Sequence, residues 1–276
     1  MSAHLAKDEI LVLGATGTTG RRLTALLRAA GVSVRPASRK GQVRFDWAEP
    51  ATWEPAVTGA SRMYLMAPHD TPVDPAFVRL AVERGVRHIV LLSSRAIEPM
   101  GDTRLMSAER TVRESGAEWT VLRPDWFNQN FDEGVFRDAI LAGTLAVPLG
   151  TARQVFVDAD DIAAVAAAVL TGNGHAGKTY EVTGPRALSF EEAATLISRA
   201  SGRQVRYLGT GEDYLAAMGA FGLPREQTLQ EVQAFTALRD LGDGKPADTV
   251  QRLVGRAPKS FETYVTEAAA RGAWKG

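Results

Sequence analysis

Residues 10–20 read Ile-Leu-Val-Leu-Gly-Ala-Thr-Gly-Thr-Thr-Gly, a short apolar run that ends in three glycines spaced three residues apart. This pattern predicts a strand buried on both faces of a parallel sheet, a tight turn and the start of a helix. Gly14 would permit the sharp turn, Gly17 would leave room for a pyrophosphate, and Gly20 would let the helix lie close to the strand. A turn without a ligand produces similar letters, so the flanking sequence has to decide.

The flanking sequence favours a dinucleotide-binding unit. Residues 21–30 carry leucines at helical spacing, and Gly31 follows them as a common helix end. Residues 32–37 form the next predicted strand, which completes a βαβ unit whose helix would present free amides and a positive end to an anion. The predicted cofactor contacts in this unit are Gly14, Thr16, Gly17, Thr18, Thr19 and Gly20.

Composition excludes several classes of function. The chain has 276 residues, 32 Lys plus Arg and 32 Asp plus Glu, so its overall charge gives no indication of nucleic-acid binding. It has no Cys, which removes disulfides, thiol catalysis and Cys-based metal sites. Its four His are not spaced as in a helical zinc motif, so no metal is expected.

The sequence shows neither the pattern of a signal peptide nor that of a membrane-spanning helix. Residues 1–9 have no apolar signal core, and no run of 18 apolar residues occurs. We therefore expect a cytoplasmic protein that neither crosses nor binds a membrane.

Strand and helix patterns alternate as far as residue 124. The alternation predicts an α/β fold of the Rossmann type, a doubly wound parallel sheet with ligands at the carboxyl ends of its strands. On this basis residues 1–150 form the predicted NAD(P)-binding core. The further strands are expected at residues 42–45, 62–66, 88–92 and 119–123, and the helices at residues 52–57, 74–84 and 107–115.

Residues 151–276 are expected to supply the rest of the sheet and a small, mainly helical region that covers the substrate cleft, within one structural unit. Residues 158–170 form an alanine-rich helix with Asp residues at its start, and Ser189 and Glu192 have the spacing of a capping box. The other expected elements are strands at residues 179–183 and 204–208 and helices at residues 212–222 and 225–239.

The end of the second strand predicts the choice of cofactor. NAD-binding folds carry an acidic residue there, whereas this chain has Ser38, Arg39 and Lys40. A hydroxyl and two cations suit the 2′-phosphate of NADP, so NADPH is expected to be preferred over NADH. A solvated basic turn is the alternative interpretation.

Polar and small residues follow the next three strands. Asp46 either accepts a hydrogen bond from an adenine amino group or caps the following turn. Ser94 either orients a substrate carbonyl, which makes it a catalytic and pocket candidate, or satisfies the backbone of its own loop. The remaining predicted cofactor contacts at these strand ends are Met66, Ala67, Pro68 and Ser93.

An aromatic and amide cluster follows residue 125, where a strand-to-helix turn would otherwise be brief. Trp and Phe rings there would stack on a planar substrate, and Asn130 would hydrogen-bond an oxygen. The alternative is that these rings form the core where the cap meets the sheet. Asp125 is either an acid or, as the favoured interpretation, an exposed loop carboxylate. The predicted substrate pocket comprises Ser94, Trp126, Phe127, Asn130 and Phe131, with Tyr214 and Phe221 from the cap.

Several motifs together resemble the NmrA-like branch of the atypical short-chain dehydrogenases/reductases, over about residues 9 to 265. In the first half they are the glycine turn Gly14-x-x-Gly17-x-x-Gly20, Leu92-Ser93-Ser94, Ser107-Ala108-Glu109 with Ser115-Gly116, Trp119-Thr120-Val121-Leu122-Arg123-Pro124 and Asn128-Gln129-Asn130-Phe131. In the second half they are Phe156-Val157-Asp158-Ala159-Asp160-Asp161-Ile162-Ala163, Tyr180-Glu181-Val182-Thr183-Gly184-Pro185 and Ser260-Phe261-Glu262.

The resemblance implies a Rossmann domain with a small helical substrate-covering region. The family includes NADPH-dependent quinone reductases, reductases of imine, enal or enone intermediates in natural-product pathways, and non-enzymatic redox sensors that bind NADP and partner proteins. The resemblance therefore implies NADP binding, and it leaves the chemistry open between reduction and sensing.

The chain departs from the fully active short-chain reductases at one motif. Residues 102–106 stand where those enzymes have Tyr-x-x-x-Lys, with Asp102 and Met106 in the two functional positions. No tyrosine lies between Tyr64 and Tyr180, so a strong general acid is not predicted. The catalytic residues are unknown from sequence, with only Ser94 and Asn130 as candidates.

Two functions follow from this departure. The first is an NADPH-dependent reductase of a conjugated acceptor, such as a quinone, an iminium or an activated C=C bond, for which holding the nicotinamide against the acceptor is most of the catalysis. The second is a non-enzymatic NADP-binding redox sensor of the NmrA type. A small aromatic or conjugated substrate is the expected partner, with no nucleic acid and no membrane, and a monomer or homodimer is expected.

Overall fold

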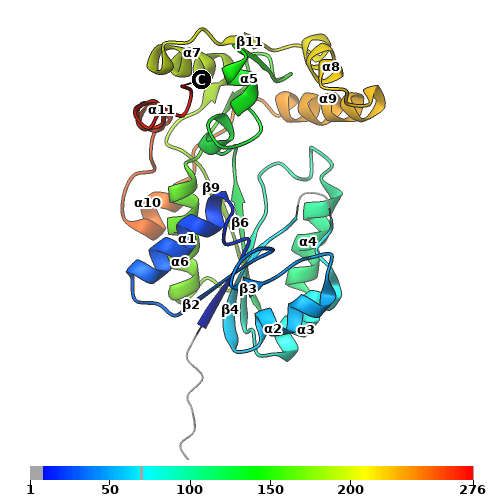
Figure 1. Cartoon of the computed structure of the whole chain (residues 1–276), viewed down its shortest axis with the longest axis vertical. Helices are drawn as coiled ribbons and strands as arrows, with labels where there is room; N and C mark the ends of the chain where they lie inside the picture. The colour runs from blue at the N-terminus through cyan, green and yellow to red at the C-terminus, as the bar shows by residue number, and fades with distance from the viewer. Residues whose placement is uncertain (1–8, 69–70, 276) are drawn as a thin grey trace, which may run out of the picture.

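The computed structural model describes residues 9–68 and 71–275, and its centre is a seven-stranded sheet in which every neighbouring pair is parallel (Figure 1). The strand order reverses between β1 and β4, which is where folds of this kind bind their ligands. Across the sheet the strands are β3 (Val43–Arg44), β2 (Val34–Ser38), β1 (Glu9–Leu13), β4 (Ala60–Met66), β5 (His88–Leu92), β6 (Glu118–Pro124) and β9 (Lys178–Val182).

Helices cover both faces of the sheet, as Figure 1 shows, and each face has its own apolar core. One face packs on α1 (Thr18–Ala29), α6 (Ala159–Thr171) and α10 (Thr249–Val254), and the other on α2 (Trp53–Val57), α3 (Pro75–Glu83) and α4 (Thr103–Arg113). The apolar run of β1 is buried throughout residues 10–13, as the pattern predicts for an inner strand. The prediction of a Rossmann-type doubly wound sheet is confirmed.

Capping side chains set where the helices begin. Asp158 accepts a hydrogen bond from the amide of Asp160, and Ser189 and Glu192 form a capping box at the start of α7 (Phe190–Ser201), as predicted. The helix expected from residue 107 begins at Thr103 instead, because Asp102 accepts a hydrogen bond from the amide of Leu105 at 2.9 Å. The first helical turn therefore contains the stretch that replaces Tyr-x-x-x-Lys.

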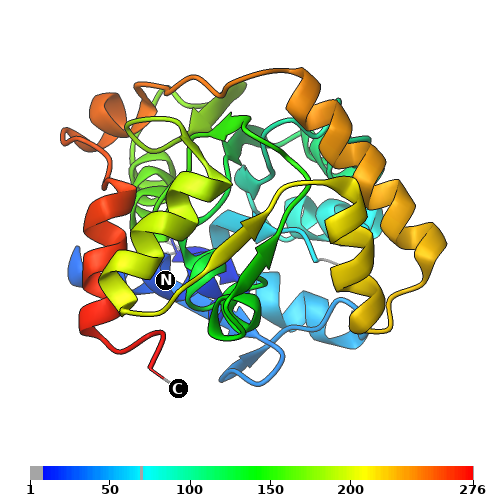
Figure 2. The same ribbon diagram turned by 90° about the horizontal axis from the view of Figure 1, so that it is seen from above.

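A cap with a third apolar core lies beyond the carboxyl ends of the strands (Figures 1 and 2). Its helices are α5 (Arg137–Leu141), α7, α8 (Gly211–Ala220), α9 (Arg225–Asp240) and α11 (Phe261–Ala270). Two small sheets complete it, namely β7 (Thr144–Ala146) with β11 (Arg206–Leu208) and β8 (Arg153–Gln154) with β10 (Leu188–Ser189). The expected helical cap is present, although β7, β8, β10, α5 and α11 were not predicted.

The chain enters the cap three times. Residues 125–157 leave the sheet after β6, form part of the cap and return as α6 and β9, and the chain then re-enters the cap with α7. After α9 it returns to the sheet face as α10, and it enters the cap a third time with α11. The short η1 (Pro50–Thr52) and η2 (Asn128–Phe131) lie at the ends of β3 and β6. Within the part of the chain that the structure describes, no helix is long and apolar enough to cross a membrane.

Candidate cofactor and substrate site

The glycine turn has the geometry of a phosphate-binding loop. Gly14 has a φ of +66°, which favours glycine, and a Cβ on Gly20 would lie 2.2 Å from the carbonyl oxygen of Gly14. Gly17 is the extended residue before α1, and a Cβ there would meet only that same oxygen, at 3.2 Å. The fold itself therefore requires glycine at 14 and 20, whereas Gly17 keeps open the approach to the first amides of α1.

The threonines of the turn differ in what they can contact. Thr16 is exposed and Thr18 is partly exposed. Thr19 is buried, and its hydroxyl accepts a hydrogen bond from Tyr64 at 3.0 Å. Its side chain is thus used inside the fold, and a cofactor would meet Thr19 through its main chain.

A cleft of about 350 Å³ lies between the glycine turn, α1 and the end of β2. It is lined by two predicted residues, Thr16 and Ser38, and also by Arg21 and Arg28, which were not predicted. Arg28 stands on α1 seven positions after Arg21, so both guanidinium groups border this cleft from one helix face, although Arg21 also pairs with Glu133.

The two predicted phosphate ligands lie beside this cleft. Arg39 and Lys40 are exposed immediately after β2, and neither has an ion-pair partner in residues 9–68 or 71–275. Their charges are therefore free to meet an anionic ligand at the end of β2.

Asp46 caps the turn that follows β3, because its Oδ1 accepts a hydrogen bond from the amide of Ala48 at 3.0 Å. This is one of the two roles expected for it, and its contact with adenine stays a prediction. A second cavity of about 390 Å³ begins at its neighbour Trp47 and extends to Asp74 and to Ser107 on α4.

The ends of β4 and β5 border the turn. The side chain of Met66 lies against Gly14, where an added Cβ would be 2.7 Å from its Cε, and Ala67 is buried. The carbonyl of Pro68 accepts a hydrogen bond from Arg104 at 2.8 Å. These three residues are close to the expected cofactor path, and their contacts with a cofactor stay predictions.

Ser93 is directed into the fold. It is buried, and its hydroxyl donates to Glu109 at 2.6 Å, so only its main chain remains for a cofactor. Ser94 is partly buried and donates weakly to the carbonyl of Arg95 at 3.3 Å. Of the two serines, Ser94 is the one whose hydroxyl is available for a substrate.

Glu109 organises this strand end, and sequence reasoning missed it. The carboxylate is 1% exposed and accepts hydrogen bonds from Ser93, from Arg113 and, through two nitrogens at 2.8 and 2.7 Å, from Arg123. Burial alone would raise its pKa, but these donors and charges outweigh burial and hold the pKa of Glu109 below its ordinary value. A carboxylate on the buried stripe of α4, beside Leu105 and Val112, is the pattern that would have revealed it.

The tyrosines do not supply the missing proton donor. None of the five is followed by lysine four residues on. Tyr264 is buried beside Asp132, and burial raises its pKa. The other four hydroxyls have partners, namely Thr19 for Tyr64, His175 for Tyr180, the carbonyl of Val147 for Tyr207 and Glu231 for Tyr214.

The segment after β6 joins the sheet to the cap. Trp126 is partly buried, stacks on Phe235 of α9 with ring centroids 6.0 Å apart, and meets Phe190 edge-on. Phe127 is partly buried against the core formed with α1 and α6, and Asn130 is partly exposed. Trp126 and Asn130 therefore remain the best-placed pocket candidates.

Phe131 was predicted to line the pocket, and this is wrong. Its ring is 0% exposed and packs edge-on against Phe156 and Phe261 in the cap core, while its carbonyl accepts a hydrogen bond from Trp274. The short helix η2 turns the side chain inward, so the alternative interpretation, a core aromatic, holds for Phe131.

Tyr214 and Phe221 are the two cap residues that were predicted to line the substrate pocket. The Tyr214 hydroxyl donates to Glu231 at 2.7 Å and joins α8 to α9. Phe221 follows α8 and is 68% exposed, so it does not line an enclosed pocket. Tyr214 keeps its place as a pocket candidate and Phe221 does not.

Asp125 was expected to be exposed, and it is buried. Its carboxylate accepts a hydrogen bond from the amide of Trp126 at 2.7 Å and pairs with Arg95 at 3.1 Å. Burial raises the pKa of Asp125 against the opposing effects of that amide and of Arg95. This pair ties the loop after β5 to the aromatic segment.

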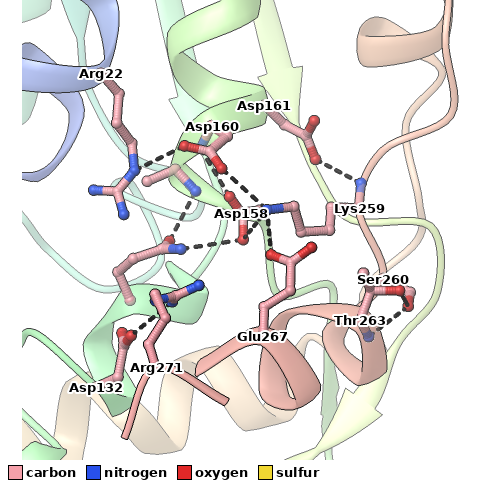
Figure 3. Close-up of polar contacts among 12 residues, drawn as sticks. Arg22, Asp132, Asp158, Asp160, Asp161, Lys259, Ser260, Thr263, Glu267 and Arg271 are labelled. Carbon is pink, nitrogen blue, oxygen red and sulfur yellow. Dashed lines mark hydrogen bonds and ion pairs between the residues drawn. The ribbon is translucent and has the colours of Figure 1, made fainter. Parts of the chain in front are cut away.

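A charged cluster at the start of α6 joins three parts of the fold (Figure 3). Asp158 is buried and accepts a hydrogen bond from Gln129, and Lys259 reaches Asp160 at 3.0 Å. Arg22 of α1 reaches the same Asp160 at 2.9 Å. These cations balance the carboxylates, and no group of three or more potential ligands in the described residues is arranged to hold a metal ion.

Comparison with known proteins agrees with this architecture. The model of the NmrA-like family matches residues 42–265. The NAD(P)H azoreductase of Xenophilus azovorans is 33% identical over 96% of this chain and 99% of its own length. The (4-alkanoyl-5-oxo-2,5-dihydrofuran-3-yl)methyl phosphate reductase of Streptomyces griseus is 33% identical over 94% of this chain and 98% of its own.

Among solved structures, the NADPH-dependent quinone oxidoreductase QOR2 of Escherichia coli in complex with NADPH has a TM-score of 0.73 and 22% identity, over 94% of this chain and 99% of that one. This likeness confirms the fold. The extent of the family match and the relatives at 33% identity confirm the resemblance predicted from the motifs. The chain belongs to the NmrA-like family.

Proposed function

We propose that the protein is an NADPH-dependent reductase that delivers hydride to a conjugated small-molecule acceptor, such as a quinone, an iminium or an activated C=C bond. The observation that carries the proposal is the open glycine turn before α1 at the reversal of strand order, with Arg39 and Lys40 at the end of β2, which have no ion-pair partner among the residues that the structure describes. The names of the 33% identical relatives, an NAD(P)H azoreductase and a furanyl phosphate reductase, support reduction as the reaction class.

The residues fit such a cofactor. The first amides of α1 and the space beside Gly17 would hold the pyrophosphate, and Ser38, Arg39 and Lys40 would hold the 2′-phosphate. When bound, NADPH supplies a hydride from C4 of its nicotinamide. The chain contributes binding and orientation: Trp126 offers a flat ring to the acceptor, and Asn130 offers a hydrogen bond to its oxygen or nitrogen.

The acceptors differ in whether they need a proton after hydride transfer. An iminium that gains a hydride becomes a neutral amine and needs no proton. A quinone that gains a hydride and one proton becomes a hydroquinone, and water can provide that proton because the reduced quinone is an oxyanion that water protonates readily. General acid catalysis, typically worth about 100-fold to 10,000-fold, would be largely forgone, so we expect modest turnover.

Replacing Arg39 with alanine should remove the preference for NADPH. The lost charge-assisted contact with the 2′-phosphate is worth about 1.5–3 kcal/mol, and the affinity for NADPH should fall accordingly while that for NADH stays unchanged. Titration of both cofactors against wild type and Arg39→Ala measures this. Equal affinities in the wild type, or unchanged NADPH affinity in the variant, would contradict the assignment.

Stereospecifically 4-deuterated NADPH tests the reaction itself, with a panel of quinones, iminium ions, activated alkenes and simple ketones. Label should appear in products that receive hydride at carbon, and Phe replacement of Tyr64, Tyr180 or Tyr214 should each leave the rate within a few-fold. An indispensable tyrosine, or activity on simple ketones alone, would refute the mechanism. Tight NADPH binding with no turnover of any acceptor would instead favour a redox sensor, a function consistent with Asp102 and Met106 at the Tyr and Lys positions.

The proposal includes three further predictions. The acceptor is a quinone, an iminium or an activated C=C bond, the protein is cytoplasmic, and it is a monomer or a homodimer.

A further inference from the structure

Arg22 connects the glycine turn to residues 126–134, which carry Trp126 and Asn130 and are called the acceptor segment. It lies two residues after Gly20, and its guanidinium donates to the carbonyl of Thr18 at 2.8 Å, to Asp160 at 2.9 Å and to Glu133 at 2.8 Å. Figure 3 shows Arg22 approaching Asp160 from α1. The side chain is only 17% exposed.

Glu133 lies in a turn that packs on Asn130. The amides of Glu133 and Gly134 both donate to the carbonyl of Gln129 at 2.9 Å. A Cβ on Gly134 would lie 3.0 Å from the Cα of Asn130 and 3.3 Å from its Oδ1, so this turn packs directly on the Asn130 side chain. A shift of Glu133 would therefore shift Asn130.

The charges favour a stable connection. Arg21 also pairs with Glu133, so two guanidinium groups hold one carboxylate. Burial opposes the charged form, but hydrogen bonds and charges from these two arginines hold the pKa of Glu133 below its ordinary value. The carboxylate therefore stays charged at neutral pH.

The helix α1 thus contacts both the expected cofactor site and the acceptor segment. The start of α1 would hold the cofactor's phosphates, and the same helix holds the acceptor segment through Arg22. Hydride transfer requires the reacting atoms to be held at about 3–3.5 Å, and errors near 1 Å can cost about 100-fold in rate.

We infer that Arg22 and Glu133 are a positioning pair that sets Asn130 relative to the nicotinamide end of the cofactor. The inference rests on the proposed function. Both residues act through Asn130 and need not touch the acceptor.

Kinetics of Glu133→Gln test the inference, since this change keeps the side-chain length and removes the charge. We expect kcat for the best acceptor to fall at least 10-fold while the Kd for NADPH stays within two-fold. Arg22→Gln should act in the same way, and the double variant should be no slower than the slower single variant, because both changes break the same Arg22–Glu133 pair. Arg22→Lys keeps the positive charge but loses the planar set of N–H donors of the guanidinium. It provides a milder variant if Glu133→Gln does not fold.

Glu262→Gln is the matched control, because Glu262 forms an Arg–Glu pair with Arg186 away from the glycine turn. It should leave kcat and Kd unchanged. Wild-type kcat in Glu133→Gln, additive effects in the double variant, or a loss of NADPH affinity that accounts for the whole effect would overturn the inference. A wild type that fails to bind NADPH or to reduce any acceptor would instead refute the proposed function.

Discussion

Gly17→Val should abolish NADPH binding and leave the protein folded. Gly17 has a φ of −78°, which valine can adopt, and a Cβ there would meet only the carbonyl oxygen of Gly14 at 3.2 Å. The valine methyl groups would instead occupy the space expected for the pyrophosphate. Loss of two charge-assisted hydrogen bonds from the amides of α1, each worth about 1.5–3 kcal/mol, would weaken binding more than about 100-fold.

Fluorescence titration with NADPH and thermal unfolding by circular dichroism measure the two parts of this result. Gly219→Val is the control, because a Cβ on Gly219 of α8 would meet nothing within 4 Å. It should bind NADPH as the wild type does. Normal binding by Gly17→Val would mean that the glycine turn is structural, and the proposed function would fail although the fold would stand.

Glu109→Gln should lower the free energy of unfolding by about 3 kcal/mol at neutral pH, near the lower end of the range for breaking a buried ion pair. The glutamine would leave Arg123 without its buried partner, although Arg123 keeps its contact with Glu98. Urea unfolding followed by circular dichroism measures the difference. Glu114→Gln, an exposed change at the end of the same helix, should cost less than about 0.5 kcal/mol.

The pH dependence of this effect has a defined sign. Because the folded pKa of Glu109 lies below its unfolded value, its charge stabilises the fold fully above the unfolded pKa of about 4.3. That stabilisation is lost as the pH falls through the folded pKa. The stability gap between wild type and Glu109→Gln should therefore be constant from about pH 6 upward and narrow below about pH 4. A gap that does not change with pH would show that packing, not charge, is what Glu109 contributes.

The sheet and its ligand-binding edge were predictable because their residues act locally. Apolar runs, glycines and capping residues such as Asp158 determine strands, turns and helix starts within a few positions, and these predictions agree with the structure except at α4, which begins at Thr103 and not at residue 107. The strands β8 and β10 have two residues each, so their sequence carries no alternation from which to predict them.

The side chains of the site were harder to predict, because their roles depend on partners distant in sequence. Phe131 turns into the core because Phe156 and Phe261 meet it there, and Asp125 is buried because Arg95 pairs with it. Arg22 and Glu133 lie more than a hundred positions apart, and neither carries a local pattern that marks the other as its partner. Such contacts follow from tertiary packing, which a single sequence does not display.

The three passages of the chain through the cap determine how the molecule can be divided. A fragment that ends at residue 150 would lack α6 and β9, which would leave the edge of β6 unpaired and the apolar side of α1 uncovered. Such a fragment would be prone to aggregate. The sheet edge closes only after the chain has built part of the cap, so we expect the two to unfold in one cooperative transition. The cap is thus built from three segments of the same chain, separated by α6 with β9 and by α10, and exchanging it between relatives would require new junctions at all five crossings between sheet and cap.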